Sequence, residues 1–334
     1  MQTIFTVFTC GYIQLSVFKS CFLLFFPAKN GIFLEKWKQI TMKQALIDLF
    51  KQAVVYKYDL PNNEIEKSTF STENDKCYEC LDNEALAKII YNSIVYYSYN
   101  ELEIEQTNIQ VLLKRALEES IKFNSNASLK TQKSYGFYGE ILLYCFLMTF
   151  FNTKPIIARG YFYSPTAKSE IKGYDSYHLL EHDDCLELWF GEAKMYISYD
   201  DALDSVLSNL KKNLHDEYLN RNFIEISKKD KYLNIKSAKI DAVINRWKSE
   251  GVNLISEIKQ QNMKLVYPIL IITNQNEEYD GTIKKFIEYI NNYEQQQIDL
   301  SIPFSLFFIF LPLKTVSSVK QGVIQCIQNQ SPLI

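Results

Sequence analysis

Glycine, proline and histidine are scarce in this chain of 334 residues, which holds 10, 8 and 3 of them respectively. With so few turn-forming residues, no linker marks a domain boundary, and the chain carries no internal repeat or low-complexity tract. The three histidines, His178, His182 and His215, have neither the spacing of a zinc site nor that of a catalytic triad. The sequence therefore gives no sign of zinc-dependent or serine-type hydrolysis.

An excess of positive charge is also lacking, because 36 basic residues stand against 39 acidic ones and the net charge is −3. This balance excludes a protein that coats nucleic acid along its whole surface, so any contact with DNA must come from a local basic patch. Hydrophobic residues make up 47% of the chain and charged residues 22%, which is typical of a globular protein.

The seven cysteines show no paired framework of disulfides. Cys145 and Cys185 lie inside apolar runs, where a reduced, buried cysteine is expected, so we predict a reducing, cytoplasmic location. Cys77 and Cys80 form the one C-x-x-C spacing in the chain. It has no second pair and no nearby histidine, which disfavours a zinc site.

Residues 1–41 are predicted to be an apolar N-terminal extension. Lys19 is the only charge among residues 1–26, so this stretch could be a signal or membrane segment. It lacks a basic start and a cleavage site, and polar residues are scattered through it. We therefore favour a natural start at Met42, or an ordinary buried element, and expect no membrane association.

Residues 42–135 are predicted to form a mostly helical region with some strand. Apolar residues recur at helical spacing over 83–97 and 111–123, whereas 61–82 is polar and acidic and is expected to be a surface loop. No residue type in this region points to a chemical reaction.

From residue 136 onward the pattern alternates between helices and strands. The run 136–151 is expected to be a buried helix in which Glu140 is the only charge. The further elements predicted are strands at 155–163, 172–180 and 185–196, a helix at 200–218, a strand at 265–273, a helix at 281–297, a strand at 302–311 and a helix at 317–328. Residues 181–184 are expected to form a hairpin turn.

A basic helical insertion is predicted at 221–262. Between Arg221 and Lys248 it holds eight basic residues and three acidic ones, inside an otherwise acidic protein. One interpretation is a solvated helical face, and the other is contact with phosphates. Under the second interpretation, the candidate nucleic-acid-binding residues are Lys211, Lys212, Lys228, Lys229 and Lys231.

Glu192 and Lys194 are the charged pair near the end of the third predicted strand. Their spacing of two places both on one face, because side chains of a strand alternate. Burying them is costly unless they are paired or bind something. Asp175 lies on the neighbouring predicted strand, so Asp175 and Glu192 could share Mg²⁺ or Mn²⁺, with Glu140 completing the acidic cluster. Lys194 would then lie beside the metal-bound water.

The order Glu140, Asp175, Glu192-x-Lys194 resembles that of the PD-(D/E)xK nuclease superfamily. Gly139-Glu140, Gly173-Tyr174-Asp175 and the run 188–194 (LWFGEAK) also resemble the HamA family, the nuclease subunit of the Hachiman anti-phage system. Tyr174 stands where the superfamily has a proline before its aspartate.

The resemblance implies an α/β fold with an α+β mixed sheet. Residues 136–334 would build this sheet on a restriction-endonuclease-like αβββαβ core. It implies catalysis by Glu140, Asp175, Glu192 and Lys194, with the three carboxylates as metal ligands. It also implies DNA as substrate and a HamB-like helicase as partner.

Two functions follow as hypotheses. The first is a Mg²⁺-dependent DNA endonuclease that acts in bacterial anti-phage defence with a helicase. The second is a catalytically inactive binding module on the same fold, which would scaffold or regulate the helicase.

Overall fold

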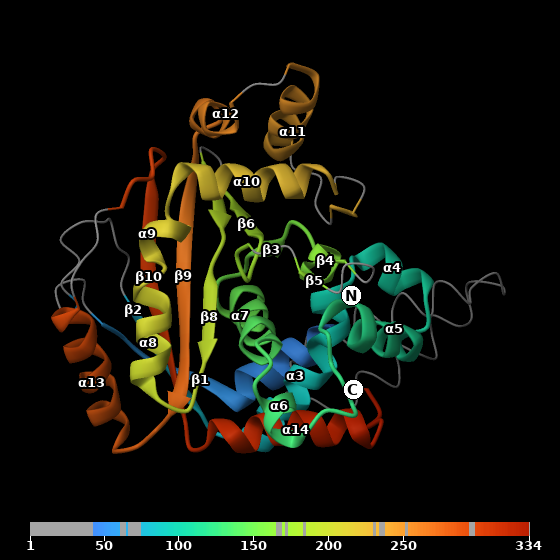
Figure 1. Ribbon diagram of the computed structural model, residues 1–334, viewed down its shortest axis with the longest axis vertical. Coiled ribbons are helices and arrows are strands. Elements are labelled where there is room, and N and C mark those ends of the chain that lie inside the picture. Colours follow the sequence, from blue (N-terminus) through green and yellow to red (C-terminus); the bar gives the residue numbers. More distant parts are fainter. Residues whose placement is uncertain are drawn as a thin grey trace, which may run out of the picture. The chain divides into compact units, whose positions relative to one another are not determined.

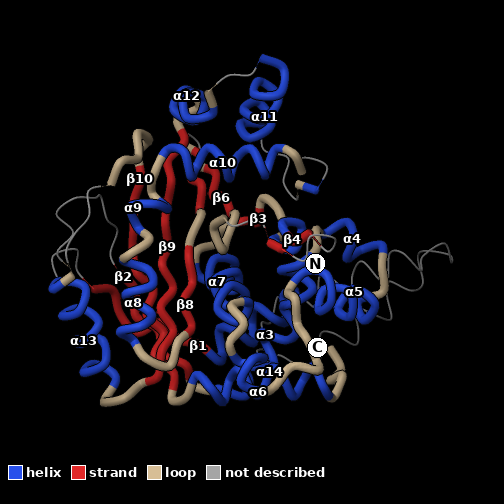
Figure 2. Tube along the Cα trace, in the orientation of Figure 1, coloured by secondary structure: helices blue, strands red, loops and turns tan. Residues whose placement is uncertain are grey.

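A mixed β-sheet between two layers of helices organises the computed structural model (Figures 1 and 2). The structure describes residues 43–60, 65, 75–164, 169–170, 173–182, 185–229, 232–233, 238–250, 253–293 and 298–333. Residues 43–334 form one compact unit. The apolar stretch predicted as an extension, 1–41, lies outside the described residues.

Within the described ranges the main sheet has eight strands. These are β1 (Val54–Leu60), β2 (Asp75–Cys80), β3 (Lys154–Pro155), β6 (His178–Glu181), β7 (Leu186–Trp189), β8 (Glu192–Met195), β9 (Met263–Asn274) and β10 (Phe304–Leu313). The order is β1-β2-β10-β9-β7-β6-β3, and β8 also pairs with β9. Strands β2, β10, β9 and β7 run parallel, whereas β1, β6 and β3 join antiparallel. The predicted mixed sheet is confirmed.

Helices connect and cover these strands. Residues 43–53 are helical. The named helices are α3 (Asn83–Ser98), α4 (Glu101–Gln106), α5 (Ile109–Arg115), α6 (Leu129–Lys133), α7 (Phe137–Phe150), α8 (Tyr199–Leu207), α9 (Leu210–Asn213), α10 (Asp216–Ser227), α11 (Ala238–Glu250), α12 (Leu254–Gln260), α13 (Tyr279–Asn292) and α14 (Val316–Gln328). A short ribbon of β4 (Tyr163–Ser164) and β5 (Ser169–Glu170) stands apart from the main sheet.

Two apolar cores lie on the two faces of the sheet. One core joins α3, α7 and α14 to strand residues such as Leu270 and Ile309. The other joins α8, α10 and α13 to Ile269 and Phe308. Neighbouring residues of one strand enter opposite cores because strand side chains alternate. The sheet is therefore buried on both faces, as long apolar strands such as β9 and β10 require.

Most of the elements predicted after residue 136 are confirmed. The apolar periodicity correctly placed helices α7, α13 and α14 and strands β9 and β10. It also placed the hairpin between β6 and β7. Hydrophobic periodicity succeeds here because each element is long or is bounded by polar residues.

The surface loop predicted at 61–82 is wrong over 75–80, which form strand β2. This strand pairs with β1 on one side and with β10 on the other. Its polar residues are accommodated individually: buried Asp75 accepts a hydrogen bond from the backbone N–H of Phe308 at 2.7 Å. The region predicted to be mostly helical thus supplies two strands of the main sheet.

The strand predicted at 155–163 is also wrong. Lys154–Pro155 and Tyr163–Ser164 are separate two-residue strands, and Arg159–Phe162 between them form a 3-10 helix. Gly160 lies so close to α3 that an added Cβ would lie 2.5 Å from the carbonyl oxygen of Ser98. An apolar run can therefore be buried without being a strand, and periodicity alone does not distinguish the two cases.

Strand β2 sends Cys77 and Cys80 into opposite cores. Two side chains on opposite faces of a sheet cannot share one zinc ion, which agrees with the sequence-based expectation. Among the described residues, no helix combines the length and the apolar character needed to cross a membrane.

Candidate active site

The strand predicted over 185–196 consists of two strands in line. Both β7 and β8 run parallel to β9, and they keep one register across the break between them. The break at Phe190-Gly191 lies beside Pro268, which has no N–H to donate. A Cβ on Gly191 would lie 2.5 Å from the carbonyl oxygen of Pro268, so this close approach requires glycine. Beyond the break, β8 carries the charged pair.

Glu192 and Lys194 lie on one face of β8, as their spacing predicted. The Lys194 ammonium forms an ion pair with Glu192 Oε1 at 2.6 Å, and the two side chains are 19% and 10% exposed. Burial disfavours the charged ammonium, but the neighbouring carboxylates of Glu192 and Asp175 outweigh burial and raise the pKa of Lys194 above its ordinary value. Lys194 is therefore a cation at neutral pH.

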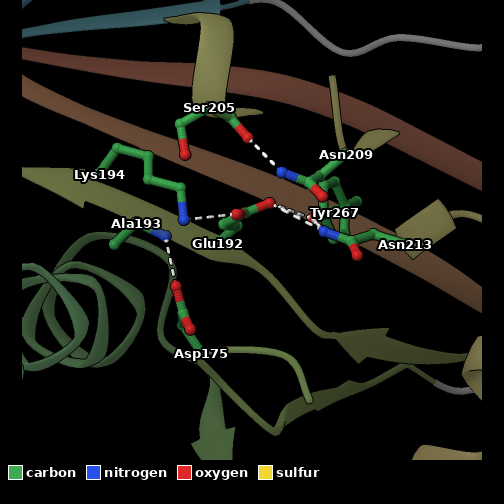
Figure 3. A network of polar contacts seen from close by, with 8 residues as sticks. All are labelled: Asp175, Glu192, Ala193, Lys194, Ser205, Asn209, Asn213 and Tyr267. Atoms are coloured by element: carbon green, nitrogen blue, oxygen red, sulfur yellow. Dashed lines mark hydrogen bonds and ion pairs between the residues drawn. The ribbon is translucent and has the colours of Figure 1, made fainter. Parts of the chain in front are cut away.

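The second oxygen of Glu192 is held by two further donors (Figure 3). Tyr267 in β9 donates its hydroxyl to Oε2 at 2.8 Å, and Asn213 in α9 donates from Nδ2 at 3.0 Å. Asn213 Nδ2 also contacts the Tyr267 hydroxyl oxygen at 3.1 Å. The Glu192 carboxylate is thus fixed in orientation by groups from three elements.

Asp175 does not lie within a strand, which corrects the strand predicted at 172–180. It belongs to the loop 173–177, directly before β6. Its backbone N–H donates to the Gly191 carbonyl at 2.9 Å, and the Ala193 N–H donates to Asp175 Oδ2 at 2.9 Å. The predicted neighbourhood of Asp175 and Glu192 is therefore formed by a loop against the open edge of β8.

The loop that carries Asp175 is tied down on both sides. Ser176 Oγ accepts the Gly191 N–H at 2.9 Å, and the Tyr177 hydroxyl accepts the Tyr174 N–H at 3.1 Å. Tyr174 in turn donates its hydroxyl to the Asn213 carbonyl at 2.8 Å. Backbone and hydroxyl groups thus replace the ladder hydrogen bonds that a strand would have made.

Burial raises the pKa of Asp175 to about 8, and the carboxylates of Glu140 and Glu192 add to the increase. Lys194 and the Ala193 N–H act in the opposite direction. The carboxylates of Glu140 and Glu192 therefore lie close enough to Asp175 to repel its negative charge, which is the electrostatic signature of a site that favours a cation.

Glu140 reaches this cluster from α7. The helix packs on β8 at Gly139, where an added Cβ would be in ordinary van der Waals contact with the Cβ atoms of Met195 at 3.4 Å and Ala193 at 3.5 Å. The hydroxyl of Tyr97 in α3 donates to Glu140 Oε2. Figure 1 shows α7 beside β8 on the side away from β9. All four residues singled out in the sequence are thus brought to the same edge of the sheet.

Among the described residues, no three Asp, Glu, His or Cys side chains are already arranged around a point where a metal ion would fit. One oxygen of Glu192 is occupied by Lys194. The donor set is nevertheless that of a hard divalent cation, because carboxylate oxygens are the ligands that Mg²⁺ and Mn²⁺ prefer. The mutual repulsion at Asp175 is what such an ion would relieve.

The described lysines among the predicted nucleic-acid-binding residues lie on α9 and at the end of α10. Lys211 and Lys212 are exposed on α9, next to Asn213. Lys228, at the end of α10, pairs with Glu225 at 2.6 Å, and Lys229 lies 5.8 Å from the centre of the Phe162 ring. Lys231 lies outside the described residues. The pair on α9 directly precedes Asn213, which donates to Glu192.

Residues of the site that the sequence did not reveal are Asn213, Tyr267 and Tyr97. A helical break places Asn213: the helix predicted over 200–218 is three helices, α8, α9 and α10. The Asn209 side chain donates to the Ser205 carbonyl at 2.7 Å, where α8 gives way to α9. For Tyr267, the sequence offers one clue: it is a tyrosine, next to a proline, in the otherwise aliphatic strand β9.

The fold and the site define an α/β protein in which a Glu-x-Lys strand, an aspartate loop and a glutamate helix meet at one edge of a mixed sheet. The chain belongs to the HamA family: the family model described as HamA matches residues 47–326. The resemblance inferred from the sequence is confirmed at the level of the family. Comparisons with curated proteins and with solved structures found no match.

Proposed function

We propose that this protein is a metal-dependent DNA endonuclease of the PD-(D/E)xK type that acts in anti-phage defence. Membership in the HamA family supports the role in defence. The nuclease proposal rests on two interactions of β8. The Lys194 ammonium forms an ion pair with Glu192, and the Ala193 N–H donates a hydrogen bond to Asp175.

A bound divalent cation would supply a Lewis acid and a water of lowered pKa. Asp175, Glu192 and Glu140 would hold that ion with their carboxylate oxygens. Lys194 would exchange its contact with Glu192 for the phosphate, where its ammonium offsets negative charge as the P–O bond breaks. Tyr267 and Asn213 would keep the Glu192 carboxylate oriented during this exchange.

The family resemblance further supports a helicase partner of the HamB type, which would restrain the nuclease until aberrant DNA is engaged. A catalytically inactive binding module is the second candidate. The ion pair that occupies one oxygen of Glu192 favours it, together with the lack of a preformed metal cluster among the described residues.

Plasmid cleavage in Mg²⁺ or Mn²⁺, with and without the helicase, tests the nuclease proposal. Lys194→Met and Asp175→Asn should each abolish cutting. Lys264→Met is the matched control, since Lys264 in β9 pairs with Glu187 in β7 at 2.8 Å, away from the three carboxylates. Cutting that survives in Lys194→Met would refute the assignment. If wild-type protein never cuts and calorimetry detects no metal binding, the binding module is the function.

A further inference from the structure

Two exposed cations lie near the ring of Tyr218 in α10. Lys212 Nζ and Arg221 Cζ are each 5.9 Å from the centre of its ring. Cations over an aromatic face are attracted by the ring and are held in place without losing their charge. The three side chains, named the α10 triad here, come from α9 and α10, which follow one another along the chain (Figure 1).

The two cations of the α10 triad have no carboxylate partner among the described residues, unlike several other lysines of the chain. Lys88 pairs with Glu84 at 2.8 Å and Lys264 with Glu187 at 2.8 Å, for example. Besides its contact with the Tyr218 ring, Arg221 donates a hydrogen bond to the Glu217 carbonyl of its own helix, at 3.4 Å. Their charge is therefore available to an anionic ligand.

The α10 triad adjoins the candidate active site. The Tyr218 ring packs edge-to-face on Tyr174, the residue before Asp175, with ring centres 5.0 Å apart. Lys212 directly precedes Asn213, which holds Glu192. Burial and the charges of Asp175 and Glu192 raise the pKa of Tyr218 to about 12, so its hydroxyl is a hydrogen-bond donor at neutral pH.

We propose that Lys212, Tyr218 and Arg221 bind the DNA phosphates that flank the phosphate to be cleaved. The proposal rests on the nuclease function proposed above and names its substrate-positioning subsite. A cluster of carboxylates repels a polyanion, so a nuclease needs compensating cations at the rim of its site. The two unpaired cations of the triad meet this need, and the Tyr218 hydroxyl adds a neutral donor.

The salt dependence of DNA binding tests the subsite directly. Each phosphate contact contributes about 0.9 to the slope of log K against log salt concentration on duplex DNA. We expect Arg221→Ala and Lys212→Ala each to reduce the slope by about that amount. Arg221→Lys should restore it, because the charge returns. Tyr218→Phe should weaken binding without changing the slope, since only a neutral donor is lost.

Binding is measured by fluorescence anisotropy of a labelled duplex in EDTA, where no cleavage occurs. Lys88→Ala is the matched control, because Lys88 is exposed but paired on α3, in the helix layer on the other face of the sheet. Slopes that stay unchanged in both alanine variants, or a wild-type protein that does not bind the duplex, overturn the subsite.

The two proposals fail separately. A wild-type protein that cuts DNA, with unchanged slopes in the variants, refutes the subsite and leaves the nuclease. A wild-type protein that never cuts, with reduced slopes in both alanine variants, refutes the nuclease and leaves a DNA-binding surface. Because Lys212 and Arg221 are exposed, their substitution leaves the core intact.

Discussion

The ammonium of Lys320 in α14 donates a hydrogen bond to the carbonyl oxygen of Met195, the last residue of β8, at 3.0 Å. It also donates to the Lys133 carbonyl at 3.0 Å and lies 5.4 Å from the centre of the Tyr138 ring. One buried cation thus connects the C-terminal helix to the strand of Lys194 and to the helix of Glu140. No carboxylate pairs with it among the described residues.

Because of Lys320, the free energy of unfolding should change with pH in the alkaline range. Burial lowers its pKa to about 8, below the ordinary value of 10.5, so the unfolded chain binds a proton that the folded chain has lost between these two values. The contribution of Lys320 to stability therefore rises with pH from 8 to 10.5, by up to about 3 kcal/mol. Urea unfolding of wild type and Lys320→Met at pH 7.5 and 10.5 measures this difference. A difference between the two proteins that is the same at both pH values would contradict it.

Asp175→Asn should stabilise the protein near pH 8. The pKa of Asp175 is raised to about 8 from 3.8, so the folded state holds a proton that the unfolded state releases in this range. The contribution of Asp175 is fully present below pH 3.8 and is lost as the pH rises to 8, by an amount on the order of a few kcal/mol. Asparagine keeps the acceptor for the Ala193 N–H and removes the charge.

Thermal melts of the two proteins in EDTA at pH 5 and pH 8 check this expectation. The advantage of the variant should be large at pH 8 and small at pH 5. Millimolar Mg²⁺ should then raise the melting temperature of wild type and not that of Asp175→Asn, because a ligand stabilises the state that binds it. Equal shifts in both proteins would argue against a metal ion at this carboxylate.

Gly191→Ala should be destabilising by about 1–3 kcal/mol, the usual cost of overpacking. The added Cβ would meet the backbone of Pro268, which cannot yield as a flexible side chain can. Gly281→Ala in α13 is the matched control: its Cβ meets only the end of the Glu277 side chain, and alanine favours a helix by about 0.5–1 kcal/mol. Urea midpoints distinguish the two, and equal midpoints would show that β7 and β8 tolerate a shift.

Tyr267→Phe should slow cleavage about tenfold or more. The variant removes the 2.8 Å hydrogen bond to Glu192 Oε2, and hydrogen bonds to charged groups contribute about 1.5–3 kcal/mol. Tyr279→Phe is the control, since its hydroxyl donates to the Tyr78 carbonyl at 2.8 Å, outside the site.

The control should lose some stability and keep its cleavage rate. A shift in the pH profile of cleavage in Tyr267→Phe, and not in Tyr279→Phe, would identify Tyr267 as the residue that tunes Glu192. If both variants cut with the same rate and profile as wild type, Tyr267 serves the core alone.

The part of the site predicted from the sequence is the part set by local geometry. The alternation of a strand places Glu192 beside Lys194 whatever surrounds them, and an apolar helix with one charge isolates Glu140. Both depend on residues a few positions apart, which a sequence displays directly.

What the sequence could not show depends on contacts between distant segments. Asp175 lies in a loop because its N–H donates to the Gly191 carbonyl, while Ser176 Oγ accepts the Gly191 N–H. Strand β2 appears polar in isolation, and it is a strand because β10 and β1 flank it. Asn213 reaches Glu192 only after a helical break sets α9. In each case tertiary partners overrode the local pattern.

In the described part of the chain, β8 pairs with one strand, β9. The ribosome translates β9 late, about 70 residues after β8. A ribosome that has reached residue 262 has already translated Glu140, Asp175, Glu192 and Lys194, but not the strand that supports two of them or the Tyr267 hydroxyl. The four side chains therefore cannot be assembled until synthesis has passed residue 274. A chain of the proposed nuclease that ends before β9 would therefore leave the DNA of its own cell uncut.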